Sequence, residues 1–356
     1  MTKCYFCGDE ITKENKSKEH IILNAIGGVL ASCKLICKKC NDRFGDKTDS
    51  LLAKQLSPFS VLMNVKRQRG ETPPIKAVRS SNNEKILIYP GGQLENTDSK
   101  VEKQEMNGKK IYHIVARNDN EMGRICKNLK KKHPSFEVLN SGEIVENIDE
   151  KVLIEYDLGG DALESVCKTA LNYYLYARGK QEHVQTFIEK LRNHDVLDLC
   201  NFCYTNKIKI GKTEDGIFHA IALKGDSQQK LLYAYIEFFD FYHVIVLLND
   251  SYDGETFQKV YCYNLIKKGE CEASFDVDLT YDTIYDILSK DLKDYGKELV
   301  SELKSTVKQI EIKNAIDKAC NEIEVEYSER FHGDIPADVF AKAFAKKISK
   351  SLLRSK

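Results

Sequence analysis

The sequence of 356 residues balances 54 Lys and Arg against 54 Asp and Glu, so its formal net charge is zero. Its 42% hydrophobic and 30% charged residues are the composition of a soluble globular protein. The N-terminus lacks the apolar core of a signal peptide, and no apolar run approaches the roughly 20 residues that span a membrane. We therefore expect a cytoplasmic protein with two or three hydrophobic cores and no membrane partner.

The cysteines cluster near the N-terminus. Five of the twelve fall within residues 4–40, and four of these form two Cys-x-x-Cys pairs, Cys4 with Cys7 and Cys37 with Cys40. In a large chain without an export signal, such pairs favour a metal site over disulfides. Two pairs can place four thiolates around one Zn²⁺ ion, which then has no open position to activate water. We expect a structural zinc at these four cysteines.

Positive charge is concentrated at the two ends of the chain. Residues 1–70 hold thirteen Lys and Arg against seven Asp and Glu, a formal excess of six positive charges. Residues 341–356 hold six Lys and Arg and no acid. A basic head and a basic tail on a balanced protein favour a polyanionic partner such as DNA.

The first segment has the pattern of two strands and a helix. An apolar strand is expected over 19–23, and the paired glycines after it predict a bend because glycine tolerates positive φ. The second cysteine pair then leads into a short helix. The expected elements are the strand over 19–23, a bend at Gly27-Gly28, a strand over 34–36 and a helix from Cys40 to Gly45. This order predicts a ββα unit that the metal holds together.

The next helix is expected to begin at Thr48-Asp49, which could cap it, and to end at Pro58. Pro73-Pro74 marks a boundary near residue 72, because paired prolines stop helices and stiffen a linker. Beyond it the residue pattern predicts strands over 75–78, 85–89, 110–116, 151–157, 217–223, 231–238, 242–248 and 260–266, helices over 119–132, from 161 and over 183–192, and a helical region from 281 with a break at 331–334.

These elements predict an α+β protein in three parts. Residues 1–72 form the small zinc-bound head, and residues 73–280 form a larger mixed α/β domain. Residues 281–356 form a helical C-terminal region with the basic tail. No ligand motif stands out in the middle domain, so target selection, sensing and assembly are all open roles. The C-terminal region is a candidate surface for a protein partner or a second copy of the chain.

The head also carries residues suited to phosphodiester hydrolysis. His20 follows Glu19 on an apolar strand, and Asn41 opens a helix. A neutral imidazole can take a proton from water near pH 7, and carboxylate and amide oxygens are ligands that Mg²⁺ prefers. A lone histidine on an apolar strand is more often a satisfied core residue. Neighbours on an ideal strand also point to opposite faces, so Glu19 and His20 share one site only if the strand twists or starts there.

Together these residues resemble the HNH endonuclease family, which has the ββα-metal fold. The resemblance implies that His20 is the general base and that Glu19 and Asn41 bind a catalytic Mg²⁺ or Mn²⁺ ion. It also implies that the cysteines hold zinc and that DNA is hydrolysed to leave a 5′-phosphate. The middle asparagine that often orients the base has no clear equivalent here, and Leu23 replaces a common proline. The matching residues are Cys4, Cys7, Glu19-His20-Ile21-Ile22, Gly27-Gly28, Cys37, Cys40-Asn41 and Phe44-Gly45.

Several other residues have two readings each. Asp49 could add a metal ligand, although helix capping is the simpler expectation. A third pair, Cys200 and Cys203, could bind a second zinc through the fold or be buried as small hydrophobic residues. The aromatic clusters at 173–176 and 238–242 suit core packing better than base stacking. Four basic residues could hold phosphates or form a solvated face: Lys38, Lys39, Arg43 and Lys47.

Two functions remain open. The leading hypothesis is a metal-dependent DNA endonuclease, and by analogy alone it could act in bacterial restriction or anti-phage defence. The alternative is a non-catalytic, zinc-stapled module for nucleic-acid binding or assembly. The joint presence of Glu19, His20 and Asn41 favours the enzyme, because a binding module has no need of all three.

Overall fold

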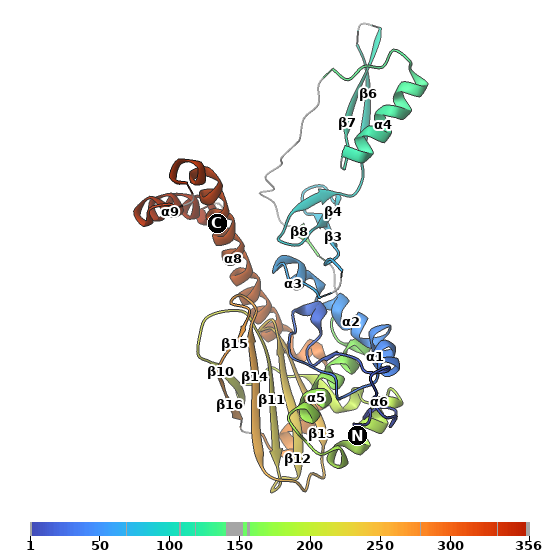
Figure 1. The fold of residues 1–356 in the computed structure, drawn as a ribbon, viewed down its shortest axis with the longest axis vertical. Helices are drawn as coiled ribbons and strands as arrows, with labels where there is room; N and C mark the ends of the chain where they lie inside the picture. Colours follow the sequence, from blue (N-terminus) through green and yellow to red (C-terminus); the bar gives the residue numbers. More distant parts are fainter. Residues whose placement is uncertain are drawn as a thin grey trace.

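The computed structural model describes residues 2–68, 70–106, 108–117, 119–139, 152–154, 157–277, 279–332 and 334–353. Within these residues, helices and strands are mixed in an α+β fold with a helical C-terminus, as predicted. Figure 1 shows a sheet-rich body with the N-terminal head beside it, a smaller sheet next to the head, and two projections that lead away from the body.

The head contains a short hairpin and a helix. Strand β1 (Glu19–His20) pairs antiparallel with β2 (Ala31–Ser32), and the 3₁₀ helix η1 (Asn24–Ile26) lies between them. Helix α1 (Lys38–Gly45) follows and ends at the predicted residue. The strand expected over 34–36 is wrong, because the hairpin closes earlier. The backbone carbonyl of Leu35 instead accepts a 3.1 Å hydrogen bond from Tyr5 N–H of the first cysteine pair.

The bend of the hairpin depends on its two glycines. Gly27 ends η1 with φ of 103°, a left-handed conformation that side chains with a Cβ rarely adopt. At Gly28 a Cβ atom would lie 1.9 Å from the backbone oxygen of Ile22. Only glycine fits at this position, which explains why the bend needs both residues.

Two helices complete the head. Helix α2 (Thr48–Gln55) begins where expected, but its N-cap residue is Lys47 and makes no side-chain capping bond. Asp49 lies in the first turn and does not cap the helix, so that expectation is wrong. Pro58 does not end a helix either, because it lies in the first turn of α3 (Ser57–Leu62), where its missing N–H costs nothing.

A four-stranded sheet follows the head, in the order β5-β4-β3-β8. Its strands are β3 (Ile75–Arg79), β4 (Lys85–Ile88), β5 (Leu94–Asn96) and β8 (Val152–Leu153). Alternate residues of β3 and β4 form a separate small core with Val61 of α3. Strand β8 falls within the strand expected over 151–157, of which Lys151, Glu155 and Tyr156 lie outside the described residues.

An arm of residues 100–132 is inserted between β5 and β8. It consists of the antiparallel hairpin β6 (Lys100–Met106) and β7 (Lys109–Val115), followed by helix α4 (Asp119–Lys132). Figure 1 shows the arm at the far end of the molecule from the six-stranded sheet. Strand β6 was not predicted, because all seven of its side chains are exposed and leave no apolar alternation in the sequence.

The body is built on a six-stranded sheet in the order β15-β14-β11-β12-β13-β9. Alternate residues of each central strand point to opposite faces, so that Ile236 and Tyr235 of β12 belong to two different cores. This explains why all eight residues of β12 are buried. The strands are β9 (Cys200–Phe202), β11 (Phe218–Asp226), β12 (Leu231–Phe238), β13 (Tyr242–Asn249), β14 (Phe257–Asn264) and β15 (Gly269–Glu270).

Each face of this sheet is covered by different elements. The pair β10 (Ile208–Lys212) and β16 (Ala273–Val277) and helix α7 (Tyr281–Leu288) pack on one face. Helix α5 (Leu163–Tyr176) crosses the other face and shares one continuous core with the head. Shorter elements complete this layer: η2 (Gly160–Ala162), η3 (Gln181–Val184), α6 (Gln185–Arg192) and η4 (Leu197–Leu199).

The C-terminal helices form the second projection. After η5 (Leu292–Tyr295), helix α8 (Gly296–Phe331) begins against the body, where the Thr306 hydroxyl donates a 2.8 Å hydrogen bond to the backbone oxygen of Phe239. It then leaves the body and meets α9 (Ala337–Leu353) (Figure 1). Helix α8 ends at Phe331 with His332 as its C-cap, inside the predicted break, and the last three residues of the basic tail lie outside the described part of the chain.

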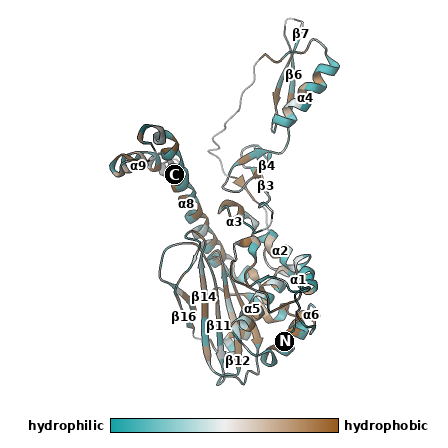
Figure 2. Ribbon diagram, in the orientation of Figure 1, coloured by the Kyte–Doolittle hydropathy of each residue, from teal (hydrophilic) through white to brown (hydrophobic). Residues whose placement is uncertain are grey.

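Burial decides two of the open interpretations, those of the aromatic clusters and of the third cysteine pair. The aromatic clusters belong to the core, since Tyr174, Phe238 and Tyr242 are buried, and Figure 2 shows the apolar strands around them. Cys200 and Cys203 are also buried and belong to no group of metal-ligating side chains among the described residues. Within the same residues, no helix is long and apolar enough to cross a membrane.

Candidate active site and metal centre

The two cysteine pairs meet in space. The Sγ atoms of Cys4, Cys7, Cys37 and Cys40 all lie within 4.8 Å of one another, and those of Cys7 and Cys37 are 3.7 Å apart. Tetrahedral zinc with Zn–S bonds of about 2.3 Å requires sulfurs about 3.8 Å apart. The cluster therefore has the geometry of a structural zinc site.

Local structure places these four thiols. Cys4 lies in a tight turn, where Gly8 N–H donates to its carbonyl and its own N–H donates to Asp9. Cys37 precedes α1 and Cys40 lies in the first turn of that helix, so both sulfurs come from one helix end. Burial raises the pKa of the Cys40 thiol, and the neighbouring Cys37 thiol raises it further. A bound Zn²⁺ would supply the positive charge that four thiolates in this buried place require.

His20 lies at the edge of the head. Its side chain is half-buried, and its Nε2 atom is buried without a hydrogen-bond partner among the described residues. Burial lowers the pKa of His20, and the positive charges of Lys18 and Lys168 lower it further. The imidazole is therefore neutral near pH 7, and its free nitrogen can accept a proton.

Gln68 is a neighbour of His20 that the sequence did not reveal. Its side chain lies close enough to the imidazole to raise the pKa of His20 slightly, against the larger effect of burial, and it accepts a 3.3 Å hydrogen bond from Lys18 Nζ. Its backbone N–H donates to Asn24 Oδ1 at 2.7 Å, which anchors the segment after α3 to the hairpin bend. Gln68 therefore lies beside the imidazole of His20, although the two residues are 48 positions apart in the chain.

Glu19 points to the other side of the strand. It is only 2% exposed, and its Oε1 atom lies 2.7 Å from Lys168 Nζ of α5. Asn172 Nδ2, one turn further along the same helix, donates to the same oxygen at 2.8 Å, and Tyr5 donates to Asn172 Oδ1 at 2.8 Å. The carboxylate is thus already neutralised and screened from solvent.

Asp49 is the second carboxylate on Lys168. Its Oδ2 atom accepts a 2.5 Å hydrogen bond from Lys168 Nζ, and Ser165 donates to its other oxygen at 2.6 Å. Burial alone would lower the pKa of Lys168, but Asp49 and Glu19 raise it above its ordinary value. The ammonium is therefore charged and completely enclosed, and it lies 5.0 Å from the centre of the Phe44 ring.

Asn41 lies apart from the group formed by Glu19, Asp49 and Lys168. Its side chain is half-buried in α1, and its Nδ2 atom donates a 2.8 Å hydrogen bond to the Ser17 hydroxyl next to β1. This bond uses the amide nitrogen and leaves the amide oxygen as the atom that could bind a cation. The structure thus brings Glu19 and Asp49 together on a lysine, while His20 and Asn41 have neighbours of their own.

The four predicted phosphate-binding residues differ in their surroundings. Lys38 pairs with Asp42 at 2.5 Å on the surface of α1, while Lys39 and Lys47 are exposed. The guanidinium of Arg43 lies 5.6 Å from the centre of the Phe6 ring and 3.2 Å from His194 Nε2. Lys39 and Lys47 therefore remain available to a phosphate, whereas Arg43 already has packing contacts.

Comparison with known proteins identifies the head. Residues 4–57 match the family model described as HNH endonuclease. The matched segment contains the four cysteines, His20 and Asn41, so the N-terminal head belongs to the HNH endonuclease family. Neither the comparison with curated proteins nor that with solved structures found a match. An HNH endonuclease domain suggests nuclease activity at the level of the family and implies a nucleic-acid substrate.

Proposed function

We propose that this protein is an endonuclease that hydrolyses phosphodiester bonds of DNA with His20 as the general base. One observation carries the proposal: within a segment that matches the HNH endonuclease family, His20 Nε2 is buried and has no hydrogen-bond partner in the part of the chain that the structure describes. A buried polar atom without a partner costs free energy and needs an explanation, and a role as proton acceptor supplies one for His20. The lowered pKa of His20 supports this role because it keeps the imidazole neutral.

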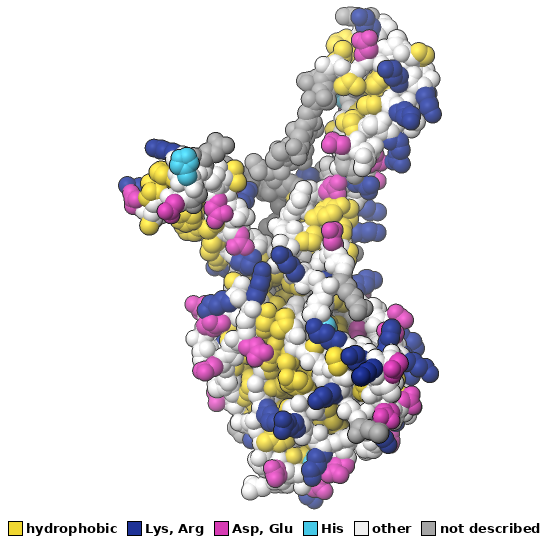
Figure 3. Space-filling model, viewed as in Figure 1, with side chains coloured by type: hydrophobic (Ala, Val, Ile, Leu, Met, Phe, Trp, Pro, Cys, Tyr) yellow, Lys and Arg dark blue, Asp and Glu magenta, His cyan; other side chains and the backbone are white. Residues whose placement is uncertain are grey.

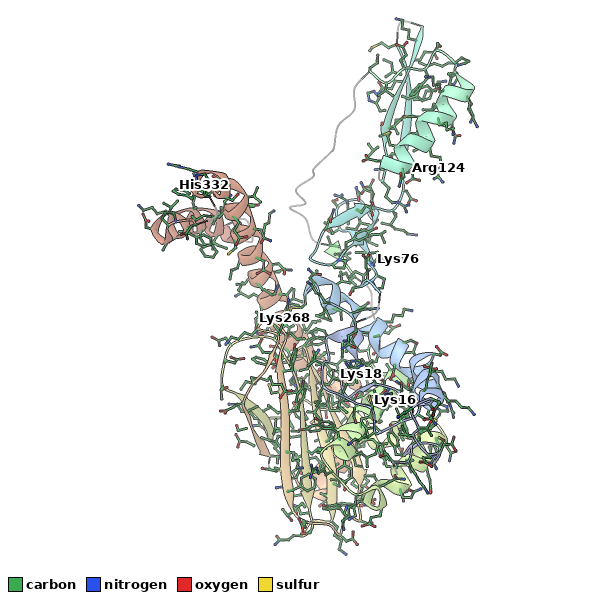
Figure 4. The ribbon with its side chains drawn as sticks, in the orientation of Figure 1. Lys16, Lys18, Lys76, Arg124, Lys268 and His332 are labelled. Atoms are coloured by element: carbon green, nitrogen blue, oxygen red, sulfur yellow. The ribbon has the colours of Figure 1, made fainter. Side chains whose placement is uncertain are left out.

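The proposed reaction is a single displacement at phosphorus. A water molecule loses its proton to His20 Nε2 while its oxygen bonds to phosphorus, and the P–O3′ bond breaks. The leaving 3′ oxygen takes a proton from solvent, so the products are a 5′-phosphate and a 3′-hydroxyl. Lys16 and Lys18 are exposed beside β1, where they can attract the phosphate (Figure 4).

The predicted Mg²⁺ or Mn²⁺ ion fits these residues only in part. Such an ion would stabilise negative charge on the phosphate and the leaving oxygen. Asn41 can offer its amide oxygen, but Glu19 offers a carboxylate only after its ion pair with Lys168 opens. The carboxylate of Asp49 is likewise available only after its own ion pair with Lys168 opens. As placed, the three residues do not form an open oxygen site for a divalent cation.

The pairing of Glu19 with Lys168 favours a second candidate function. A zinc-stapled module that binds nucleic acid or assembles with a partner needs no free carboxylate. In that case Glu19, Lys168 and Asp49 only join the head to the body. The two functions differ in one respect, which is whether the removal of His20 abolishes a reaction.

A plasmid-nicking assay with Mg²⁺ or Mn²⁺ tests the proposal. We expect the wild-type protein to convert supercoiled plasmid to nicked or linear DNA, and His20→Ala to lose at least about a hundred-fold in rate. The matched control is His332→Asn, which changes an exposed histidine with φ of 52° to a residue that tolerates this conformation. Equal rates for wild type and His20→Ala, or no metal-dependent cleavage by either, would favour the binding module.

A role in anti-phage defence is a separate proposal by analogy. It predicts that phage plate less efficiently on bacteria that express the wild-type protein than on bacteria that express His20→Ala. Equal plating on the two strains would reject the defence role and would leave the proposed nuclease activity to be judged by the plasmid assay.

A further inference from the structure

The arm of residues 100–132 is strongly basic. It holds ten Lys and Arg against four Asp and Glu, a formal charge of +6. The whole chain has 54 of each kind, so the other residues hold 44 basic against 50 acidic side chains and carry −6. A large excess of positive charge therefore lies on a part of the molecule that projects from the body, in addition to the basic head and tail (Figure 1).

Helix α4 presents its basic residues on one face. At 100° per residue, Arg124, Lys127 and Lys131 fall within one narrow sector of the helix. The half-buried apolar residues Met122, Ile125 and Leu129 fall on the opposite side and leave the basic face to solvent. The arm needs only the apolar face for its own packing, so its structure does not explain the basic one.

The surroundings leave most of this charge unpaired. Arg124 has an exposed ion pair with Glu121 at 2.9 Å, but no ion pair involves Lys127 or Lys131 among the described residues. Lysines in the last turn of a helix complement its dipole, and this explains part of the run at 130–132. It does not explain Arg124 and Lys127, which lie in the middle of the helix.

The basic residues continue from the arm to the head. Figure 4 places Arg124 on α4 and Lys76 on β3 toward one edge of the molecule, and Lys16 and Lys18 below them on the face of the head that is turned to the viewer. Figure 3 shows Lys and Arg side chains along this edge of the arm and of the sheet below it. Lys76, Lys16 and Lys18 are exposed, so the track is open to solvent.

We propose that the arm binds duplex DNA through α4 and that the duplex runs along this basic track, over Lys76, to the head. The end of the track at the head rests on the proposed role of His20. The 14 residues of α4 span about 21 Å, and an α-helix fits the major groove of B-DNA. The exposed cations are mostly lysines, which act as point charges on phosphates, so the arm adds affinity without reading sequence.

The test is a binding measurement in the His20→Ala background, so that cleavage does not interfere. The arm variant is Arg124→Gln/Lys127→Gln/Lys131→Gln, in which glutamine keeps helix propensity and removes three charges. The matched control, Lys304→Gln/Lys308→Gln/Lys318→Gln, removes three exposed charges from α8. The probe is a fluorescein-labelled duplex of 40 base pairs, about 136 Å long, and its affinity is measured by anisotropy over a series of salt concentrations.

We expect the arm variant to bind about ten-fold more weakly at 0.1 M salt and to lose up to about 2.7 from the slope of log K against log salt. The control variant should change the affinity less than two-fold. Equal affinity for the arm variant and its parent, or equal losses in the two variants, would overturn the proposal. A loss seen with single-stranded RNA and not with the duplex would also overturn it.

The outcome is separable from that of the proposed function. A protein that binds duplex through the arm but never cleaves it supports the arm and rejects the nuclease. If the wild-type protein cleaves plasmid while the arm variant binds the duplex as tightly as its His20→Ala parent, the role of the arm alone is rejected.

Discussion

The ammonium of Lys168 lies 2.7 Å from the carboxylate of Glu19, and both side chains are almost completely buried. Glu19 belongs to the metal-stapled hairpin and Lys168 to the helix that covers the central sheet. The same ammonium binds Asp49 of α2, so one lysine pairs with two carboxylates of the head. The head is thereby joined to the body by charge as well as by apolar contact.

We expect Lys168→Met to destabilise the protein by about 3–5 kcal/mol, because it leaves two buried carboxylates without a cation. Urea unfolding followed by circular dichroism gives this change in the free energy of unfolding. The compensated variant Lys168→Met/Glu19→Gln/Asp49→Asn removes the uncompensated charge and should recover most of the loss. A Lys168→Met variant as stable as wild type would show that the three groups are not coupled as the structure places them.

His219 predicts a pH dependence of stability. Its Nε2 atom donates to the Ile26 carbonyl at 2.7 Å and its Nδ1 atom accepts from Phe239 N–H at 3.3 Å, so the ring is neutral. Burial lowers the pKa of His219 from 6.5 to about 4. The unfolded chain therefore binds a proton at higher pH than the folded chain does. Stability from this group is complete above pH 6.5 and falls by about 3 kcal/mol as the pH drops to about 4.

The measurement compares wild type with His219→Gln, which keeps a donor for Ile26 but does not titrate. The difference between their free energies of unfolding should be constant above pH 6.5 and shrink below it, because only the wild type loses stability through this histidine. A difference that stays constant down to pH 4 would contradict the buried neutral imidazole.

Much of the head could be predicted because its signals are local. The two Cys-x-x-Cys pairs, Cys4 with Cys7 and Cys37 with Cys40, predict the four metal ligands from residues that lie close together in the chain.

Outside the head, helix α4 was predicted with its observed bounds, since an acid opens it and a proline follows it. Strands β11, β12 and β13 were also predicted closely, because their apolar runs are long.

The remaining features depend on contacts between distant parts of the chain. The sequence shows Glu19 beside His20 but not that Lys168, 149 residues later, takes its carboxylate. Gln68 was missed for the same reason, since no local pattern links it to His20. The predicted boundary at residue 72 stays a prediction: the small core under β3 is separate, whereas the core of the head continues into the body.

Gln68 should act as a positioning residue for His20 if the proposed reaction is correct. We expect Gln68→Ala to lower kcat for plasmid nicking about ten-fold or more and to leave KM unchanged, because a misplaced base slows the chemical step and not the binding of DNA. Gln68 is exposed, so the melting temperature should stay within about 2 °C. Gln229→Ala, an exposed glutamine in a turn of the body, is the matched control. A change in KM alone would assign Gln68 to DNA binding instead.

The last prediction concerns the zinc cluster of Cys4, Cys7, Cys37 and Cys40. We expect one zinc per chain in the wild-type protein by mass spectrometry, and none in Cys40→Ser, because the three remaining thiolates do not complete the four-coordinate tetrahedron of a structural zinc. Since zinc binding energy is folding energy in such a site, Cys40→Ser and chelation should each lower the free energy of unfolding by several kcal/mol. Cys33→Ser is the matched control, because Cys33 is exposed and lies outside the cluster, and it should keep a full equivalent of zinc. Zinc retained by Cys40→Ser, or lost by Cys33→Ser, would show that the four sulfurs do not share one ion.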